Sequence, residues 1–288
     1  MTGNILVIGG TGTTGRTLVE ILHNADVDFK VMVRSQEKAD ELNKKGVNPI
    51  LGELGDWPSV KKALKNVDSV FLLSSPSFTK VAEQNGLIDL AKEAGVRKIV
   101  KLSAVIADSG SKIHLADWHG LIEDHLRSSG LDYINLRAHS FMQNMLMLHS
   151  ITIKNDNRIY ESMGDTKIPM IDTRDVAQAS YECLTRDDLN NETYTITGPN
   201  PISYGDVAES LSKATNRKIE YVRISPEDHN KGLKNAGVPG WLADDLTIMS
   251  REWAISPKHE PTSDFNRISS KKQFDINDFA KDYANYFN

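Results

Sequence analysis

Residues 4–16 of the chain read NILVIGGTGTTGR, an apolar run that leads straight into three glycines spaced three apart. Gly9, Gly12 and Gly15 have distinct physical uses: a sharp turn, a close approach of a pyrophosphate to the backbone, and close packing of a helix on a strand. A helix that begins here offers free N–H groups and a partial positive charge to phosphates. The stretch therefore predicts a dinucleotide-binding turn between the first strand and the first helix.

Apolar runs and helical patterns alternate along the first half of the chain. We expect strands at residues 5–8, 29–33, 49–52, 67–74, 97–103 and 132–137, and helices at residues 14–24, 36–45, 58–65, 80–94 and 117–128. Gly95 is expected to end the helix before it in a left-handed conformation. Such regular alternation implies a parallel, doubly wound sheet with right-handed crossovers.

The alternation loosens after residue 137. A further strand and helix are expected within residues 168–177, and another strand at residues 193–197, before a polar, helix-rich tail. We therefore predict an α/β fold of the Rossmann type with a smaller C-terminal substrate lobe. The expected division is a nucleotide-binding domain at residues 1–150, completed by parts of residues 166–200, and a mostly helical lobe at residues 151–288.

Composition narrows the range of partners. The chain has 288 residues, a formal net charge of −5 and a single cysteine. An acidic chain argues against a nucleic-acid partner, and no apolar run approaches the roughly 20 residues of a membrane helix. Cys183 excludes an intramolecular disulfide, which suits the cytoplasm, and its helical surroundings are typical of a small buried hydrophobe. Assembly into a homo-oligomer stays open.

A cluster of cations follows the second expected strand. The residue that meets the adenosine ribose in such a fold lies about 20 positions after the glycines, where residues 31–38 read VMVRSQEK. An acidic side chain there favours NAD, whereas the guanidinium of Arg34 suits the 2′-phosphate of NADP. Lys38 and Arg16 are further candidates, although a solvated surface charge is the ordinary role of such residues. The predicted cofactor is NADPH, with NADH less favoured.

Three serines lie where strands of the predicted sheet end. Ser74 and Ser75 close the fourth strand and Ser103 closes the fifth, at the carboxyl edge where such sheets bind their cofactor. Bonding to local backbone groups is the alternative role for each. The residues expected to contact the cofactor are Gly9, Thr11, Gly12, Thr13, Thr14, Gly15, Arg16, Arg34, Lys38, Ser74, Ser75 and Ser103.

Seven stretches, in their order and spacing, resemble the NmrA-like group of atypical short-chain dehydrogenases/reductases. They are GGTGTTG (residues 9–15), VRSQEK (33–38), VDSVFLLSS (67–75), SGLDYINLR (129–137), FMQN (141–144), IDTRDVA (171–177) and YTITGP (194–199). Within that group the chain is most similar to NADPH-dependent quinone oxidoreductases. The resemblance implies hydride transfer from NAD(P)H to a quinone or a similar electrophilic aromatic acceptor, azo and triphenylmethane dyes included.

Classical short-chain dehydrogenases use a Tyr-x-x-x-Lys pair as their acid. None of the eight tyrosines here has a lysine four residues later, and His119 and Glu123 have the corresponding spacing instead. Alcohol dehydrogenase and epimerase activities are therefore disfavoured. Reduction of a quinone leaves a phenolate-like anion, whose conjugate acid has a pKa of roughly 10, so proximity to the nicotinamide can provide most of the catalysis.

Four further residues are candidates for the substrate site. His119 is the candidate catalytic residue, since an imidazole with an ordinary pKa of roughly 6.5 donates a proton or steadies an anion; a plain helix histidine is the alternative. Glu123 is expected to be a structural partner or a surface charge. Phe141, Asn144 and Met145 are candidates for an apolar substrate pocket with one polar contact, although Phe and Met at helical spacing are more often core.

Another function class fits the same features. A non-catalytic protein of the NmrA type that binds NADP(H) as a redox sensor also lacks the Tyr-x-x-x-Lys pair. We favour the enzyme because the C-terminal lobe has pocket-building segments such as VPGWL at residues 238–242. Neither a His-Glu-x-x-His metal motif nor a Gly-x-Ser-x-Gly nucleophile motif is present, so we predict no metal.

Overall fold

The computed structural model describes residues 4–256 and 259–288, which form two compact units. Unit 1 consists of Met1–Ala138, Thr173–Ile196 and Ser263–Lys271, and unit 2 of His139–Asp172, Thr197–Thr262 and Lys272–Asn288. The division differs from the expected one at both ends. Residues 139–150, expected in the nucleotide-binding domain, fall in unit 2. Residues 263–271, expected in the C-terminal lobe, fall in unit 1, where Asp264 Oδ2 accepts a hydrogen bond from the Thr195 amide at the edge of the sheet.

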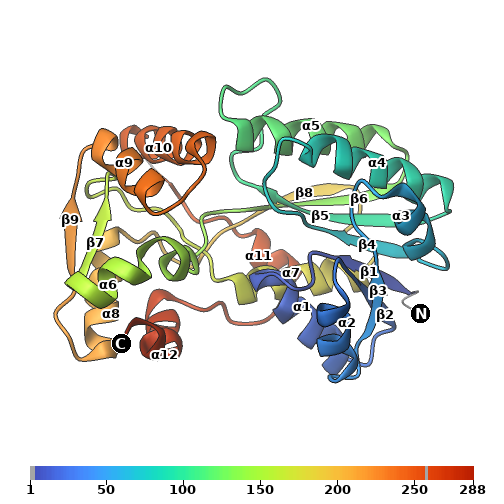
Figure 1. Cartoon of the computed structure of the whole chain (residues 1–288), viewed down its shortest axis with the longest axis horizontal. Coiled ribbons are helices and arrows are strands. Elements are labelled where there is room, and N and C mark those ends of the chain that lie inside the picture. The colour runs from blue at the N-terminus through green and yellow to red at the C-terminus, as the bar shows by residue number, and fades with distance from the viewer. Residues whose placement is uncertain (1–3, 257–258) are drawn as a thin grey trace. The chain divides into compact units, whose positions relative to one another are not determined.

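Unit 1 is built on a sheet of seven parallel strands (Figure 1). In spatial order the strands are β3 (Asn48–Leu51), β2 (Phe29–Val33), β1 (Ile5–Ile8), β4 (Ser69–Leu72), β5 (Lys98–Ala104), β6 (Asp132–Ala138) and β8 (Glu192–Ile196). The chain direction across the sheet reverses between β1 and β4, which is the switch point where Rossmann folds bind dinucleotides. The predicted doubly wound sheet is confirmed.

Helices cover both faces of this sheet (Figure 1). One face carries α3 (Trp57–Ala63), α4 (Lys80–Glu93) and α5 (His114–Ser128), and the other carries α1 (Thr13–Asn24), α2 (Gln36–Asn43) and α7 (Thr173–Thr185). Every residue of β1 and β4 is buried, as two covered faces require. Apolar side chains of the central strands pack with those of α3, α4 and α5 into one core cluster.

The predicted elements of unit 1 lie within a few residues of the observed ones, and Gly95 ends α4 with a φ of +78°. The strand expected within residues 168–177 is wrong. Ile168 and Ile171 form only isolated bridges, with Ile202 and Phe141 respectively. Pro169 stands between them and has no amide hydrogen to continue a ladder.

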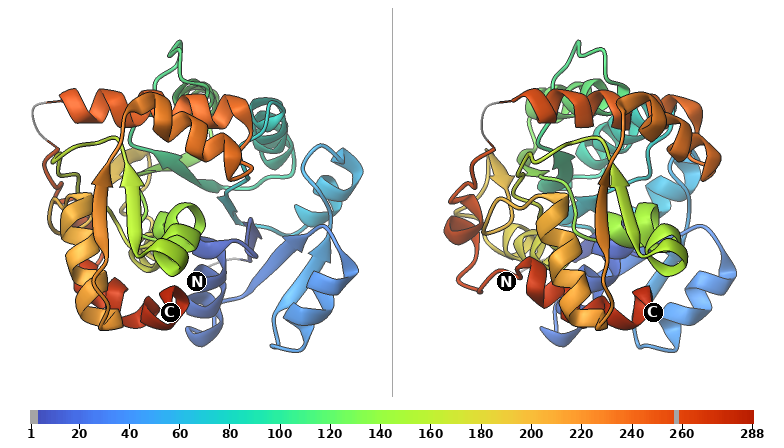
Figure 2. Two further views of the ribbon diagram at one scale, coloured as in Figure 1. Left: turned by 60° about the vertical axis from the view of Figure 1, so that its left-hand side comes forward. Right: turned by 90° about the vertical axis from the view of Figure 1, so that its left-hand side faces the viewer.

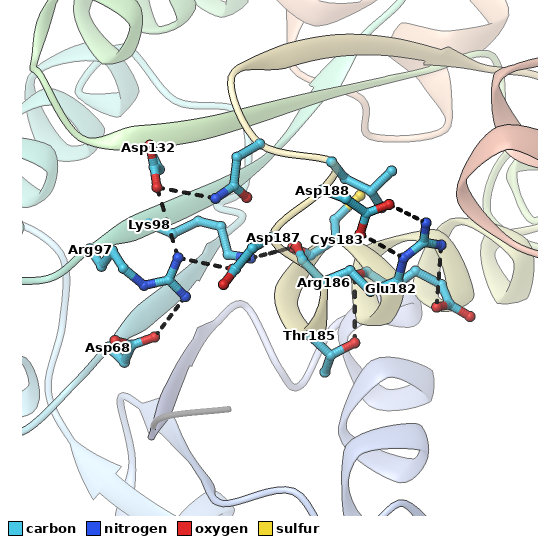
Figure 3. A network of polar contacts seen from close by, with 12 residues as sticks. Asp68, Arg97, Lys98, Asp132, Glu182, Cys183, Thr185, Arg186, Asp187 and Asp188 are labelled. Carbon is cyan, nitrogen blue, oxygen red and sulfur yellow. Dashed lines mark hydrogen bonds and ion pairs between the residues drawn. The ribbon is translucent and has the colours of Figure 1, made fainter. Parts of the chain in front are cut away.

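A buried lysine joins β5 to the end of α7 (Figure 3). Lys98 Nζ donates to the carbonyl oxygens of Cys183 and Arg186, both at 2.9 Å, and lies 3.3 Å from Asp187 Oδ1. The last carbonyls of a helix have no partner within the helix, and a cation there also complements the helix dipole. Arg97 continues the network with an ion pair to Asp187 at 2.9 Å. Lys98 therefore caps α7 from inside the sheet.

Unit 2 is organised around a two-stranded parallel sheet (Figure 2). Its elements are η1 (Met145–His149, a π-helix), α6 (Ser150–Asp156), β7 (Arg158–Glu161), α8 (Tyr204–Thr215), β9 (Glu220–Arg223), α9 (Pro226–Asn235), α10 (Gly240–Ile255) and α12 (Ile276–Phe287), while α11 (Asp264–Ile268) belongs to unit 1. Capping boxes begin α8 at Ser203 and α12 at Asp275, which satisfies free amides at both helix starts. The apolar faces of these two helices share one core.

Replacement of the buried cap by an apolar side chain is expected to destabilise unit 1. Lys98→Met leaves two carbonyl groups without their donor, at a cost of roughly 1–3 kcal/mol for each. Thermal unfolding measured by circular dichroism checks this, with Lys112→Met, an exposed loop lysine, as the control. Equal unfolding temperatures for the two variants would contradict the assigned role.

Candidate functional site

The glycine loop joins β1 to α1. Gly9 follows the strand with a φ of +81°, and the Gly12 amide donates to the Gly9 carbonyl oxygen at 3.1 Å, which closes the turn. Gly12 is the N-cap of α1, no side chain caps it, and the first turn holds no acidic residue. The helix amides and dipole therefore make this end of α1 suitable for an anion.

Three glycines are required by close contacts within unit 1. A Cβ at Gly15 would lie 2.1 Å from the Gly9 carbonyl oxygen, and one at Gly10 would lie 2.5 Å from Val31 Cγ1. A Cβ at Gly9 would lie 2.6 Å from the carbonyl oxygen of Leu73, at the end of β4. By contrast, the nearest atom to a Cβ at Gly12 is 3.5 Å away. The structure thus leaves space at Gly12, where the sequence predicts the phosphate.

The threonines of the loop differ in their surroundings. Thr13 is exposed, Thr11 is half-buried, and only 3% of Thr14 is accessible. Arg16 turns back on the loop, with Nε donating to the Thr11 carbonyl oxygen at 2.8 Å. Thr13 and the backbone of the loop are therefore accessible to a ligand, whereas the Thr14 side chain is packed inside.

The predicted cations lie on the surface beyond β2. The Arg34 side chain is 78% exposed, and its Nη1 lies 3.7 Å from Glu53 Oε1. Lys38 Nζ lies 3.0 Å from both carboxylate oxygens of Glu41. That hydrogen bond, followed by the charges of Lys38 and Arg16 among others, lowers the pKa of Glu41. Lys38 is thus paired with Glu41, and the ion pair of Arg34 with Glu53 is long and solvated, which makes it a weak contact.

The end of β4 lies next to the glycine loop, because Leu73 borders Gly9. Ser74 is half-buried, and its hydroxyl accepts a hydrogen bond from Gln84 Nε2 at 2.8 Å. Its carbonyl oxygen lies 3.5 Å from Lys80 Nζ. Ser75 is exposed. Of the two serines, Ser75 keeps its side chain accessible while Ser74 is tied to α4.

A layer of polar side chains lies between β5 and α5. Lys101 and Ser103 alternate with apolar residues along β5 and so face the same side. On α5, His119 meets both: Lys101 Nζ lies 2.9 Å and Ser103 Oγ 3.3 Å from its Nδ1. Lys80 Nζ, from α4, lies 3.3 Å from His119 Nε2. The candidate catalytic histidine is thus held between two lysines.

Glu123 completes this layer, with none of its surface exposed. Arg137 contacts both carboxylate oxygens, with Nη2 at 2.7 Å from Oε2 and Nε at 3.0 Å from Oε1. Ser103 donates its hydroxyl hydrogen to Oε1, and Arg127 Nη1 donates to Oε2 at 3.2 Å. A buried carboxylate needs such pairing to stay charged. Glu123 is therefore the structural partner that its position predicted.

Burial changes the protonation of this layer. Loss of hydration lowers the pKa of His119 well below its usual value. Burial likewise lowers the pKa of Lys101 well below the normal range and that of Lys80 to about 8. The lowered pKa favours the neutral imidazole of His119 at pH 7.

The expected pocket residues all belong to unit 2. Phe141 is half-buried and forms the bridge with Ile171, and Asn144 Nδ2 donates to Ser140 Oγ at 3.4 Å. Met145 is 1% exposed and lies in the apolar core of the unit. Its surroundings match the core role that its helical spacing also allowed.

Cys183 is fully buried on α7, and burial raises the pKa of its thiol to about 12. The prediction of a small buried hydrophobe is confirmed. Among residues 4–256 and 259–288, no three or more His, Cys, Asp or Glu side chains are arranged to hold a metal ion. Along those residues, every helix is too short or too polar to cross a bilayer.

Sequence reasoning missed Lys80 and Lys101. Lys101 carries a signal, because a charged residue in the middle of the apolar run IVKLS at residues 99–103 is unusual for a strand covered on both faces. Lys80 carries none, since a lysine in the first turn of a helix is ordinarily solvated. Only the packing of α4 against α5 brings it to His119.

Comparison with known proteins identifies the family. The model of the NmrA-like family matches residues 1–285. The chain belongs to the NmrA-like family. Among its relatives in the family is the NAD(P)H azoreductase of Xenophilus azovorans, 34% identical over 253 residues that make up 88% of this chain and 87% of that protein. Quinone oxidoreductase 2 of Escherichia coli is 29% identical over 245 residues, 84% of this chain and 85% of that one.

Solved structures of other proteins share the fold. A crystal structure of the NADPH-dependent quinone oxidoreductase of Escherichia coli with NADPH covers 96% of this chain and 99% of its own, at a TM-score of 0.85 and 24% identity. The triphenylmethane reductase of Citrobacter covers 98% and 99%, with a TM-score of 0.85 and 21% identity. These likenesses confirm the architecture of the chain.

Two glycine substitutions are expected to separate folding from binding. Gly12→Ala adds a methyl group that the fold accommodates, so the free energy of unfolding changes by less than about 1 kcal/mol, while NADPH affinity falls roughly tenfold because the phosphate loses its approach. Gly15→Ala forces Gly9 to move and costs roughly 1–3 kcal/mol or more. Thermal unfolding and titration of NADPH fluorescence measure both. Unchanged NADPH affinity in Gly12→Ala would contradict the phosphate site.

Proposed function

We propose that this protein is an NADPH-dependent reductase that transfers a hydride to quinones or to similar electrophilic aromatic acceptors. The observation that carries the proposal is the uncapped N-terminus of α1 behind a glycine loop, with open space at Gly12 and the exposed guanidinium of Arg34 after β2. Helix amides favour a pyrophosphate, and a guanidinium favours a phosphate monoester over a hydroxyl.

The residues of unit 1 fit a nicotinamide dinucleotide. The backbone from Gly9 to Gly15 would hold the pyrophosphate, and Arg34 the 2′-phosphate, with Lys38 and Arg16 adding positive charge nearby. Ser74 and Ser75, at the carboxyl end of β4, would lie along the bound cofactor. Ser103 would affect the site indirectly, through its contacts with His119 and Glu123. Bound NADPH supplies the hydride, and the protein supplies orientation.

The proton chemistry of the layer between β5 and α5 supports quinones and similar electrophilic aromatics as the acceptors. No tyrosine acid occupies this helix, and His119 is a neutral imidazole held by two lysines. Such a site suits an acceptor that is already electrophilic and whose reduced form is a stabilised anion. The names of the relatives, an azoreductase and a quinone oxidoreductase, support the same class.

The proposal predicts a cofactor preference that depends on one side chain. NADPH oxidation, followed at the nicotinamide absorbance with a panel of quinones, is expected to saturate and to exceed NADH oxidation. Arg34→Ala removes a charge-assisted contact of about 1.5–3 kcal/mol, so the KM for NADPH is expected to rise about 10- to 100-fold while that for NADH changes little.

Lys44→Ala, at the far end of α2, removes an equal charge and serves as the control; its KM values should match the wild type. Equal effects of Arg34→Ala on both nucleotides would remove the phosphate assignment. Tight NADP⁺ binding without turnover of any quinone or dye would favour the non-catalytic redox sensor instead.

A further inference from the structure

Three side chains from three elements of unit 1 form one chain of contacts: Lys80 on α4, His119 on α5 and Lys101 on β5. Lys80 Nζ lies 3.3 Å from Nε2 of the ring, and Lys101 Nζ lies 2.9 Å from Nδ1. A neutral imidazole has one N–H donor and one acceptor, whereas an ammonium group only donates. Both contacts are therefore hydrogen bonds only if the lysine that faces the ring N–H group is a neutral amine that accepts, while the other lysine donates to the ring lone pair.

Glu123 fixes the direction of these hydrogen bonds. Arg137 contacts both oxygens of the carboxylate, and the Ser103 hydroxyl donates its one hydrogen to Glu123 Oε1. Ser103 Oγ is then an acceptor at its 3.3 Å contact with His119 Nδ1. The ring proton of His119 consequently lies on Nδ1, and Nε2 carries the lone pair.

With this tautomer, one lysine accepts a hydrogen bond from the ring and the other donates one to it. Lys101 accepts from the Nδ1–H group as a neutral amine, and Lys80 donates to Nε2 as an ammonium. The environment agrees: burial and the neighbouring charge of Lys80 lower the pKa of Lys101 well below its usual range, while the pKa of Lys80 falls only to about 8. Lys80 is thus the protonated member of the chain at neutral pH.

Lys80 also lies at the cofactor edge of the sheet. Its Nζ is 3.5 Å from the carbonyl oxygen of Ser74, one residue beyond Leu73, which borders Gly9 of the phosphate loop. The carboxyl ends of β1 and β4 flank the crevice in which this fold class binds its ligands. Only 2% of Lys80 is exposed, so its ammonium group lies just inside the carboxyl end of β4, at the edge of the sheet where this fold class binds its ligands.

We propose that Lys80 is the proton donor of the reductase reaction, a role that rests on the proposed function. A quinone that has accepted a hydride from NADPH is a hydroquinone monoanion. Its anionic oxygen takes a proton from Lys80 Nζ: an O–H bond forms, an N–H bond breaks, and a neutral amine remains. Water returns a proton to the amine, so one quinone consumes one NADPH and one proton.

The titratable groups that face Lys80 are His119 from α5 and, beyond it, Lys101 from β5; the contact from β4 is the uncharged Ser74 carbonyl. In the assigned state neither His119 nor Lys101 adds a positive charge next to the ammonium group. Because the donor must be protonated, quinone turnover is expected to fall as the pH rises through the pKa of Lys80, about 8.

Two substrates that differ in whether their reduction needs a proton test the role of Lys80 as proton donor. Reduction of a quinone needs a hydride and a proton, whereas a triphenylmethane dye cation needs only the hydride, because its carbocation becomes a neutral C–H compound. Lys80→Met is expected to lower kcat for the quinone about 100-fold, within the range of general acids, and to remove the fall above pH 8. Its kcat for the dye should stay within about threefold of the wild type.

Matched variants separate proton donation from structure. Lys92→Met, an exposed lysine of the same helix, is expected to match the wild type on both acceptors. Lys80→Arg keeps the charge but holds its proton too tightly to donate it, so it should not restore quinone turnover. Loss of both acceptors in a folded, NADPH-binding Lys80→Met protein, retention of both, or rescue by Lys80→Arg would each overturn the proposal. A wild type inactive on every acceptor would instead contradict the proposed function.

Protonation states provide a readout without turnover. Long-range ¹⁵N–¹H spectra of the wild-type protein with NADP⁺ bound are expected to show His119 as the neutral Nδ1–H tautomer from pH 6 to pH 8, and ¹³Cε shifts of Lys101 to show a neutral amine. Assignment uses the Lys101→Met and His119→Gln variants. An Nε2–H tautomer, or an ammonium at position 101, would reverse the roles of the lysines and overturn the proposal.

Discussion

Glu123 carries a carboxylate without contact to solvent, and the polar layer of unit 1 is arranged around it. An unpaired charge in that position would be strongly destabilising, so Arg137 and Ser103 are bound to it. Because Ser103 gives its hydrogen to Glu123, it is left as an acceptor toward His119. In the proposed proton network, this one buried charge on α5 determines which nitrogen of the histidine bears its proton and which lysine bears a charge.

The two faces of β5 use buried lysines for different purposes. Lys98 donates to carbonyl oxygens at the end of α7 and serves stability. Lys101, three residues on, faces the opposite side, and its Nζ lies 2.9 Å from His119 Nδ1. Alternation along a strand places the two on separate faces. A lysine inside a sheet is therefore interpretable only from what its amine meets.

The proposed chemistry divides the work between the loop and the layer. The glycine loop and Arg34 would hold the dinucleotide, and the polar layer between β5 and α5, with Lys80, would supply a proton to the reduced acceptor. In the Tyr-x-x-x-Lys arrangement one helix provides both the acid and the lysine that tunes it. Here His119 and Glu123 stand at that spacing on α5, and the protonated group comes from α4. The proposed acid thus moves to a neighbouring helix while the fold is retained.

The sequence by itself determined the sheet, its flanking helices and the glycine loop, because these depend on local periodicity and on glycines whose backbone needs are local. It also located His119 and Glu123 by their spacing. It did not reveal that residues 168–171 lack a strand, that the Thr14 side chain is buried, or that Lys80 reaches His119. Those outcomes depend on contacts between segments distant in the chain, and the protonation of a buried group depends on the desolvation and neighbouring charges that only such packing creates.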